Sequence, residues 1–332
     1  MIKLLLIFTV LTHFQVVSAI NNPLKALQQS SMSTQWIAYK VSAQNNTRSM
    51  CCWNQKELSI KINGDTDLDF KSCDLKRKSH GYGTSSKSPF TDNINIYAKI
   101  KNGKVKQLLS VGDACKVKTT AKKVMWIDPV TQSNSIAFLI DIVENAQDLI
   151  AEDALYAMSH HKSKKASVKL YEIALKNNRD TSEKAVFWLG EERIDGVTYL
   201  NKLYLELPRG DVKQHINFAL AQAKNEQAIS LLKSIAKNDS DVEQRSDAIF
   251  WLSQINVEDI VPFLLNAVES DRSREVQEKA VFSLSQIETE DASNALLTLA
   301  ETHKQKNIRE KALFWLAQSD DPKVFDKLQL LL

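Results

Sequence analysis

The chain of 332 residues has few of the residues that break regular structure. It contains only eight glycines and six prolines, so a loop-rich or disordered chain is not expected. After the first 19 residues it also lacks an apolar run of the roughly 20 residues that a transmembrane helix needs. With 43% hydrophobic and 25% charged residues, the remainder is typical of about two globular domains.

Motifs of catalysis are missing as well. The sequence has no H-E-x-x-H, no G-x-S-x-G, no P-loop and no dinucleotide-binding fingerprint. Gly81-x-Gly83 is a weak signal for a phosphate-binding loop, but no helical pattern follows it, and we interpret His80–Phe90 as a loop. These absences predict a protein without enzymatic activity, cofactor or bound metal.

The first 19 residues are typical of a secretory signal peptide. Lys3 precedes an apolar run from Leu4 to Leu11, and Val17-Ser18-Ala19 matches a cleavage site. We therefore expect cleavage near Ala19 and a mature chain that is periplasmic or secreted. A membrane anchor is the alternative, but the apolar run is too short to cross a bilayer.

All four cysteines of the chain lie within one short region. They are Cys51, Cys52, Cys73 and Cys115, and in an oxidising compartment an even set predicts two disulfides. A bond between adjacent cysteines is strained, so Cys51 and Cys52 are each expected to bond to one of the other two. A metal site or a redox pair is the alternative, but the usual spacing of neither occurs.

Residues 20–130 are predicted to form a small β-rich domain. The segment Gln35–Val41 alternates two sets of residues, with Ile37 and Tyr39 on one face and Trp36 on the other. A further strand is predicted at residues 57–62.

A hairpin is predicted in the same region. Asn102-Gly103 suits a tight turn between strands Ile94–Lys101 and Lys104–Val111.

Charge divides the chain into two parts. Residues 20–130 carry 18 Lys and Arg against eight Asp and Glu, whereas residues 131–332 carry 24 against 32. The basic part, with its cluster Lys76, Arg77 and Lys78, favours an anionic partner in the cell envelope. Docking of the two halves on each other and a solvated face are the alternatives, and nucleic acid is not expected for an exported protein.

One phrase recurs along the second half of the chain, for example as REKALFWLAQ from Arg309 and EKAVFWLGE from Glu183. A second apolar segment at helical spacing follows each copy, such as Asp259–Ser270, which Asp259 is expected to cap. One landmark residue per copy recurs every 31 or 32 positions: Met158, Leu189, Leu220, Leu252, Leu284 and Leu316. A single helix pair cannot bury both apolar faces, so residues 131–332 predict an α-solenoid of about six stacked pairs.

The phrase E-K-A-[VL]-F-x-L-[GSA]-[EQ] and its period resemble the short HEAT-like repeats of phycobilisome lyases over about residues 145–332. Asp321-Pro322 and Arg309 match the aspartate-proline start and the arginine that such repeats often carry. Together with the exported Cys-rich region, the chain resembles bacterial exported HEAT repeat domain-containing proteins. The resemblance implies no enzymatic activity, and the lyase chemistry is not implied, since only the scaffold matches.

The position before each landmark alternates between small and large residues. Its members are Ala157, Trp188, Ala219, Trp251, Ser283 and Trp315. We interpret this column as interdigitated packing. The alternative is that Trp188, Trp251 and Trp315 are exposed as binding anchors.

A polar column follows two positions after each landmark. Its members are His160, Glu191, Gln222, Gln254, Gln286 and Gln318. It is either a hydrogen-bonded ladder between neighbouring repeats or the polar stripe of a recognition surface.

These patterns predict an exported, non-enzymatic scaffold that binds another protein along an extended solenoid surface. The acidic surplus of the repeats favours a basic partner. One alternative is a module that binds an anionic envelope component through the basic N-terminal domain. The other is an enzyme with a site between the two domains, which a buried, polar, titratable cluster there would indicate.

Overall fold

The structure is a computed structural model. It describes residues 23–28, 34–45, 47–53, 73–75, 81–83, 88, 90–118, 123–146, 148–191, 195–255 and 257–319. The predicted signal peptide, the strand at 57–62, the basic cluster Lys76, Arg77 and Lys78, and Asp321-Pro322 lie outside the described residues.

A four-stranded sheet forms the N-terminal part, with the strand order β6-β5-β1-β8. Strand β1 (Gln35–Ser42) pairs antiparallel with β5 (Asn93–Lys101) and parallel with β8 (Val124–Trp126). Strands β5 and β6 (Lys104–Gly112) form the predicted hairpin. At its turn Asn102 and Gly103 have φ of 52° and 71°, a left-handed conformation that these residues tolerate best.

Two short ladders carry the disulfides beside this sheet. Strand β2 (Cys51–Trp53) pairs with β4 (Gly81–Gly83), and β3 (Cys73–Asp74) pairs with β7 (Val117–Lys118). The loop predicted for His80–Phe90 is therefore wrong at Gly81–Gly83, which form a strand. Glycines at 81 and 83 have little strand propensity, and only the pairing with β2, 28 or more residues away, forms the strand.

Disulfides join Cys51 to Cys115 and Cys52 to Cys73, with Cα atoms 5.5 Å and 4.9 Å apart. This is one of the two pairings that the sequence left open. The bonds cover one face of the sheet, where Trp36 and Tyr97 are buried with three of the four sulfurs.

The opposite face of the sheet packs on the helices. Ile37, Tyr39 and Ile96 are fully buried there in one continuous core with Phe138 of α3 (Gln132–Asn145) and Leu155 of α4 (Asp148–Ser159). The predicted boundary near residue 130 thus separates strands from helices, but it does not separate two cores. The sheet closes the apolar end of the first helix pair, as a terminal cap of a solenoid must.

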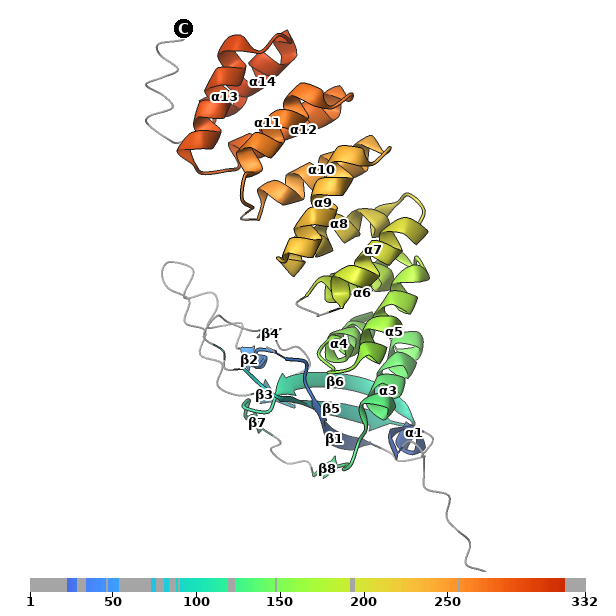
Figure 1. Cartoon of the computed structure of the whole chain (residues 1–332). Coiled ribbons are helices and arrows are strands. Elements are labelled where there is room, and N and C mark those ends of the chain that lie inside the picture. Colours follow the sequence, from blue (N-terminus) through green and yellow to red (C-terminus); the bar gives the residue numbers. More distant parts are fainter. Residues whose placement is uncertain are drawn as a thin grey trace, which may run out of the picture.

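The helices follow one another in pairs that stack away from the sheet (Figure 1). A short helix, α1 (Pro23–Gln28), precedes the sheet. The described solenoid helices are α3 (Gln132–Asn145), α4 (Asp148–Ser159), α5 (Lys164–Leu175), α6 (Arg179–Gly190), α7 (Gly196–Glu206), α8 (Asp211–Ala223), α9 (Glu226–Asn238), α10 (Val242–Ser253), α11 (Ile260–Ser270), α12 (Arg274–Ser285), α13 (Glu290–Thr302) and α14 (Lys306–Ala317).

The landmark residues lie on the even-numbered helices α4 to α14 and form the centre of the solenoid. Each is at most 2% exposed. Successive even-numbered helices contact one another and form one layer, and the odd-numbered helices form the other. A close approach within the even layer requires glycine at Gly190, because a Cβ atom there would lie 2.3 Å from the carbonyl oxygen of Ala219.

Candidate interaction surface

Aromatic rings run without a break along the even-numbered layer. We call this set the aromatic ladder. Its members are Tyr156, Phe187, Trp188, Phe218, Phe250, Trp251, Phe282, Phe314 and Trp315.

The ladder crosses from one repeat to the next by ring contacts. Phe187 stacks on Phe218 with centroids 6.0 Å apart, and Phe250 stacks on Phe282 at 6.2 Å. Between these stacks, Trp251 lies 4.7 Å from Phe218. Such pairs stabilise by about 0.5–1.5 kcal/mol each beyond their buried area, so the ladder helps to hold adjacent repeats in register.

The three tryptophans of the alternating column belong to the aromatic ladder, but they are not fully buried in the core. Trp188, Trp251 and Trp315 are each partly exposed, whereas Ala219 and Ser283 in the same column are fully buried. Each indole rests on an aromatic ring of the preceding repeat. The column therefore combines packing on one side of each ring with an accessible edge on the other.

A second column was missed in the sequence. The residue two positions before each landmark is aromatic in all six repeats: Tyr156, Phe187, Phe218, Phe250, Phe282 and Phe314. Phe314 has the spacing of a core residue in the sequence, but its side chain is 53% exposed. An apolar side chain on an amphipathic helix resembles a core residue in sequence, and only the packing shows that this column lies at the rim.

Charged groups flank the ladder. The ammonium group of Lys279 lies 5.7 Å and 5.4 Å from the ring centroids of Phe250 and Phe282, within the range of a cation-π interaction. Burial raises the pKa of Asp247, although hydrogen bonds from Asn217 and Trp251 oppose this shift. The ladder thus carries one cation and one half-buried acid near its centre.

The polar column lies at the ends of the even-numbered helices, one turn beyond the tryptophan column. Gln254 and Gln318 are helix C-caps that lie three residues after Trp251 and Trp315, a spacing that places both on one side of a helix. The members at the C-terminal end, Gln254, Gln286 and Gln318, are exposed, whereas those nearer the sheet are partly buried.

The hydrogen bonds that the structure shows for this column do not connect neighbouring repeats, as the predicted ladder would require. Gln254 donates to Ser253 at 3.2 Å and Gln286 to Ser285 at 3.3 Å, so both bonds stay within one repeat. His160, at the other end, contacts the rings of Tyr156 and Trp188.

Two hollows follow the exposed glutamines, and we call them together the turn groove. The larger, of about 600 Å³, lies between Gln254 and Gln286, and the smaller, of about 130 Å³, lies between Gln286 and Gln318 beside Trp315. Asp259 borders the larger hollow. It occupies the predicted N-cap position of α11 with φ 58°, but its side chain makes no capping hydrogen bond.

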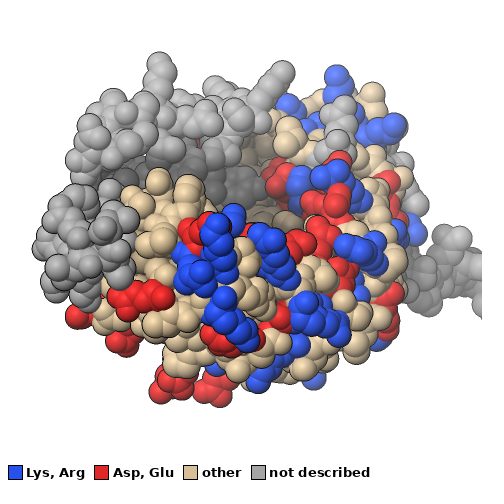
Figure 2. Space-filling model, turned by 90° about the horizontal axis from the view of Figure 1, so that it is seen from above, with Lys and Arg blue, Asp and Glu red and all other residues tan. Residues whose placement is uncertain are grey.

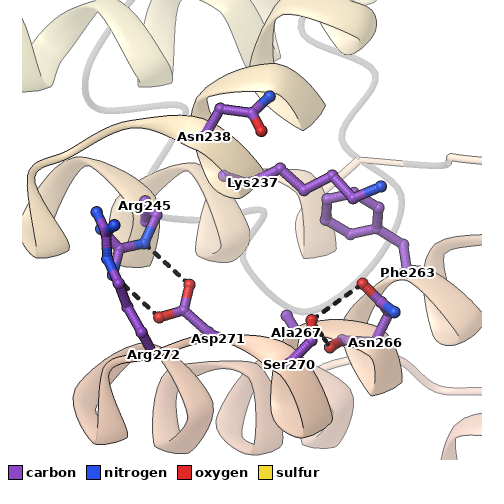
Figure 3. A pocket seen from close by; sticks show the side chains of 10 residues that line it. Lys237, Asn238, Arg245, Phe263, Asn266, Ala267, Ser270, Asp271 and Arg272 are labelled. Carbon is purple, nitrogen blue, oxygen red and sulfur yellow. Dashed lines mark hydrogen bonds and ion pairs between the residues drawn. The ribbon is translucent and has the colours of Figure 1, made fainter.

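A third hollow, shown in Figure 3, serves the scaffold. Arg245 and Asp271 face each other there, with Nε–Oδ2 and Nη2–Oδ1 distances of 2.9 Å and 3.0 Å. Arg245 also donates to the backbone oxygen of Asp239 at 2.9 Å. The polar groups of Arg245 and Asp271 therefore form hydrogen bonds within the scaffold.

This arginine belongs to another column, of which only Arg309 was evident from the sequence. In four of the repeats, the residue seven positions before the landmark donates to the carbonyl of the helix C-cap six residues earlier. The donors are Lys213, Arg245, Gln277 and Arg309, and the acceptors are Leu207, Asp239, Asp271 and His303. Such bonds satisfy carbonyl groups that a helix end leaves without a partner.

A buried polar cluster lies where the sheet meets the solenoid. Ser135 Oγ is 2.7 Å from His161 Nε2 and 2.9 Å from the hydroxyl of Tyr39. His161 Nδ1 lies 2.8 Å from the carbonyl oxygen of Ala157, which only accepts, so Nδ1 carries a proton. All three side chains are fully buried.

Charges on the surface are mixed in sign. Figure 2 shows Lys and Arg interspersed with Asp and Glu on the face seen from above. In the described part of the chain, no helix is long and apolar enough to cross a membrane. Within the same residues, no group of three or more His, Cys, Asp or Glu side chains is placed to hold a metal ion.

Comparison with known protein families finds a match in the C-terminal repeats. The family described as HEAT repeats matches residues 229–317 and 261–332. The sequence has no significant match among curated proteins.

Solved structures of other proteins are similar to part of this chain. The human deoxyhypusine hydroxylase in complex with glycerol is 19% identical, with a TM-score of 0.31, and the match covers 56% of this chain and 73% of the hydroxylase. The complex of CpcE and CpcF of phycocyanin lyase from a Nostoc species is 16% identical, with a TM-score of 0.35, and the match covers 47% of this chain and 100% of the matched lyase chain. The family match confirms the expected HEAT-like repeats in residues 229–332, the C-terminal part of the chain.

Proposed function

We propose that this protein is a non-enzymatic scaffold that binds another protein through the aromatic ladder and the adjoining ends of the even-numbered helices. One observation carries the proposal, namely nine aromatic rings in contact across six helices. The eight rings on the even-numbered helices α6 to α14 are each at least partly exposed. Tyr156, at the sheet end, is the one buried member.

Rings held in this way suit binding. Tryptophan is enriched at the energetic centres of protein interfaces, and a ring that already packs on its neighbour loses little conformational freedom when a partner covers it. Repeats bind by summing such contacts over several units rather than through one enclosed pocket.

Site-specific crosslinking tests the proposal. The photoreactive amino acid p-benzoylphenylalanine is placed at Phe314, on the ladder, and in a second protein at Leu205 on α7, whose side chain is 76% exposed. After irradiation in the native source, we expect one partner protein to crosslink at position 314 and not at 205. Equal crosslinking at both positions, or none at 314, would contradict the proposal.

We also propose that the protein is exported. Both disulfides are consistent with an extracytoplasmic location, and the first 19 residues supply the expected signal. Mass spectrometry of the purified protein should find an N-terminus near Ile20 and no free thiol, whereas a chain that starts at Met1 in the cytoplasm would contradict export.

A second candidate function is binding of an anionic envelope component through the basic residues 20–130. The charge of this part, 18 Lys and Arg against eight Asp and Glu, favours it. Binding of the full chain to vesicles rich in anionic lipid should fall steeply with salt, and replacing Lys76, Arg77 and Lys78 by alanine should weaken it. Binding that is insensitive to salt would exclude this function.

A further inference from the structure

We infer that the turn groove binds a basic segment of the partner protein in the extended polyproline II conformation, with three residues of the segment to each repeat. The inference rests on the proposed function, because it names the part of the partner that the solenoid recognises. Charge, shape and spacing of the groove each support it.

The charge of the groove is of one sign. Asp259, Glu288 and Asp291 line the larger hollow and are exposed, and no Lys or Arg lines either hollow. None of these three carboxylates forms an ion pair with another residue that the structure describes. Elsewhere on the solenoid, acidic side chains commonly have such partners, as Glu152 has in Lys184 at 2.7 Å. A cationic ligand would therefore find carboxylates in the groove without having to displace an internal cation.

The floor of the groove is apolar. Ile255, Val261 and Ile287 are partly exposed in the larger hollow, and Trp315 borders the smaller one. An apolar floor with acidic walls suits a segment that combines basic side chains with prolines. Aromatic and apolar grooves of this kind are the usual sites for polyproline II ligands.

The spacing of the glutamines matches this conformation. Gln254, Gln286 and Gln318 occupy the same position on successive helices of one layer, and packed helices lie about 8–10 Å apart. A polyproline II segment presents the same side every three residues, or about 9.3 Å. A β-strand presents the same side every two residues, about 6.6–6.8 Å, and an α-helix every turn, about 5.4 Å. Both distances are shorter than the spacing between packed helices.

The chemistry of the glutamines matches as well. The amide group of glutamine has two N–H donors, and the bonds to Ser253 and Ser285 use only one donor each of Gln254 and Gln286. A polyproline II backbone has no internal hydrogen bonds, so its carbonyl groups are available as acceptors. Each repeat can thus bind one carbonyl group of the segment.

Labelled peptides test the inference on the full-length, oxidised protein by fluorescence anisotropy, up to about 1 mM peptide, the weak end of specific binding. The probes are four repeats of Pro-Pro-Arg, four of Pro-Pro-Glu and four of Gly-Ser-Arg. We expect the Pro-Pro-Arg peptide to bind at least about tenfold more tightly than either of the others, because only it combines the charge with a preformed conformation. Absence of binding, or equal binding of the Gly-Ser-Arg peptide, would overturn the inference.

Variants locate the site. Gln286→Ala should weaken binding about fivefold, the effect of one hydrogen bond. Joint replacement of Asp259, Glu288 and Asp291 by their amides should weaken it at least about tenfold and reduce its dependence on salt.

The matched controls are Gln227→Ala, exposed on α9, and Glu258→Gln, exposed beside the groove but not lining it. Both should bind as the wild type does, and equal losses in controls and groove variants would place the peptide elsewhere and overturn the inference. If the peptides fail while position 314 still crosslinks a partner, the inference falls and the proposed function stands. If position 314 also fails, both fall.

Discussion

The sheet region and the solenoid of this protein are held together in different ways. In the sheet region, strands far apart in the chain pair with each other, as β1 does with β8, and one disulfide joins residues 64 positions apart. In the solenoid each helix contacts its near neighbours, and equivalent contacts recur in each repeat. The sheet region thus depends on a few constraints of large individual effect, and the solenoid on many similar ones of smaller effect.

One ion pair of the solenoid is an exception, because it should have a large individual effect. Breaking it should give the largest loss of stability among the changes considered. Arg245→Ala leaves Asp271 without its buried partner, whose side chain is 2% exposed, and should lower the free energy of unfolding by about 3–5 kcal/mol. Urea denaturation followed by circular dichroism measures the change.

The control is Arg274→Ala, which removes an arginine 70% exposed that pairs with Glu278 at 2.7 Å. Its effect should be below about 1 kcal/mol. If both variants lost the same amount, burial would not distinguish the two pairs.

Removal of the shorter disulfide tests the sheet region. Joint replacement of Cys52 and Cys73 by serine opens a loop of 21 residues and should cost about 2–4 kcal/mol. Hydrogen exchange should become faster in β1, β5 and β6 but not in α9 to α14. Faster exchange along the whole solenoid would show that the two regions unfold as one unit.

Alkaline pH probes the junction between the two regions. Burial raises the pKa of Tyr39 well above its ordinary value of 10.0, and the hydrogen bond with Ser135 opposes this shift only in part. Since the folded state holds this proton more tightly, the stability from Tyr39 is fully present below pH 10.0 and is lost as pH rises above it.

Tyr39→Phe should therefore be less stable at neutral pH by about 1 kcal/mol, the effect of one hydrogen bond, but should lose less stability above pH 10. Thermal unfolding between pH 7 and about 11.5 measures both effects. Parallel pH profiles of the wild type and the variant would contradict the role of this hydroxyl.

The smallest effect is expected within the tryptophan column. Ser283 Oγ is buried and has no hydrogen-bond partner among the described residues, so Ser283→Ala should be neutral or stabilise by up to about 1 kcal/mol. The reverse change, Ala219→Ser, places a hydroxyl at an equivalent fully buried position and should destabilise. Destabilisation by Ser283→Ala would point to a hydrogen bond that the structure does not show.

The repeats were predictable because their contacts are local. A landmark residue every 31 or 32 positions was enough to predict the helix pairs, and each landmark is buried as expected. The hairpin around Asn102-Gly103 was predictable for the same reason, since a turn of two residues sets its register.

Other features depend on contacts that leave no local pattern. The strand Gly81–Gly83 forms only by pairing with Cys51–Trp53. The column of Arg245 and Gln277 was missed because its acceptors are backbone carbonyls, which every residue possesses. The accessible edge of the aromatic ladder was missed because Phe314 has the same spacing as a core residue.

We propose that the even-numbered layer is the binding face and the sheet region its cap. The affinity of the crosslinked partner for two variants is the decisive measurement. Phe314→Ala should weaken binding by about 2 kcal/mol, or roughly 30-fold, the usual effect at an interface hot spot. Leu205→Ala, on the other layer, should bind as the wild type does, whereas unchanged binding of Phe314→Ala, or an equal loss in both variants, would contradict the claim.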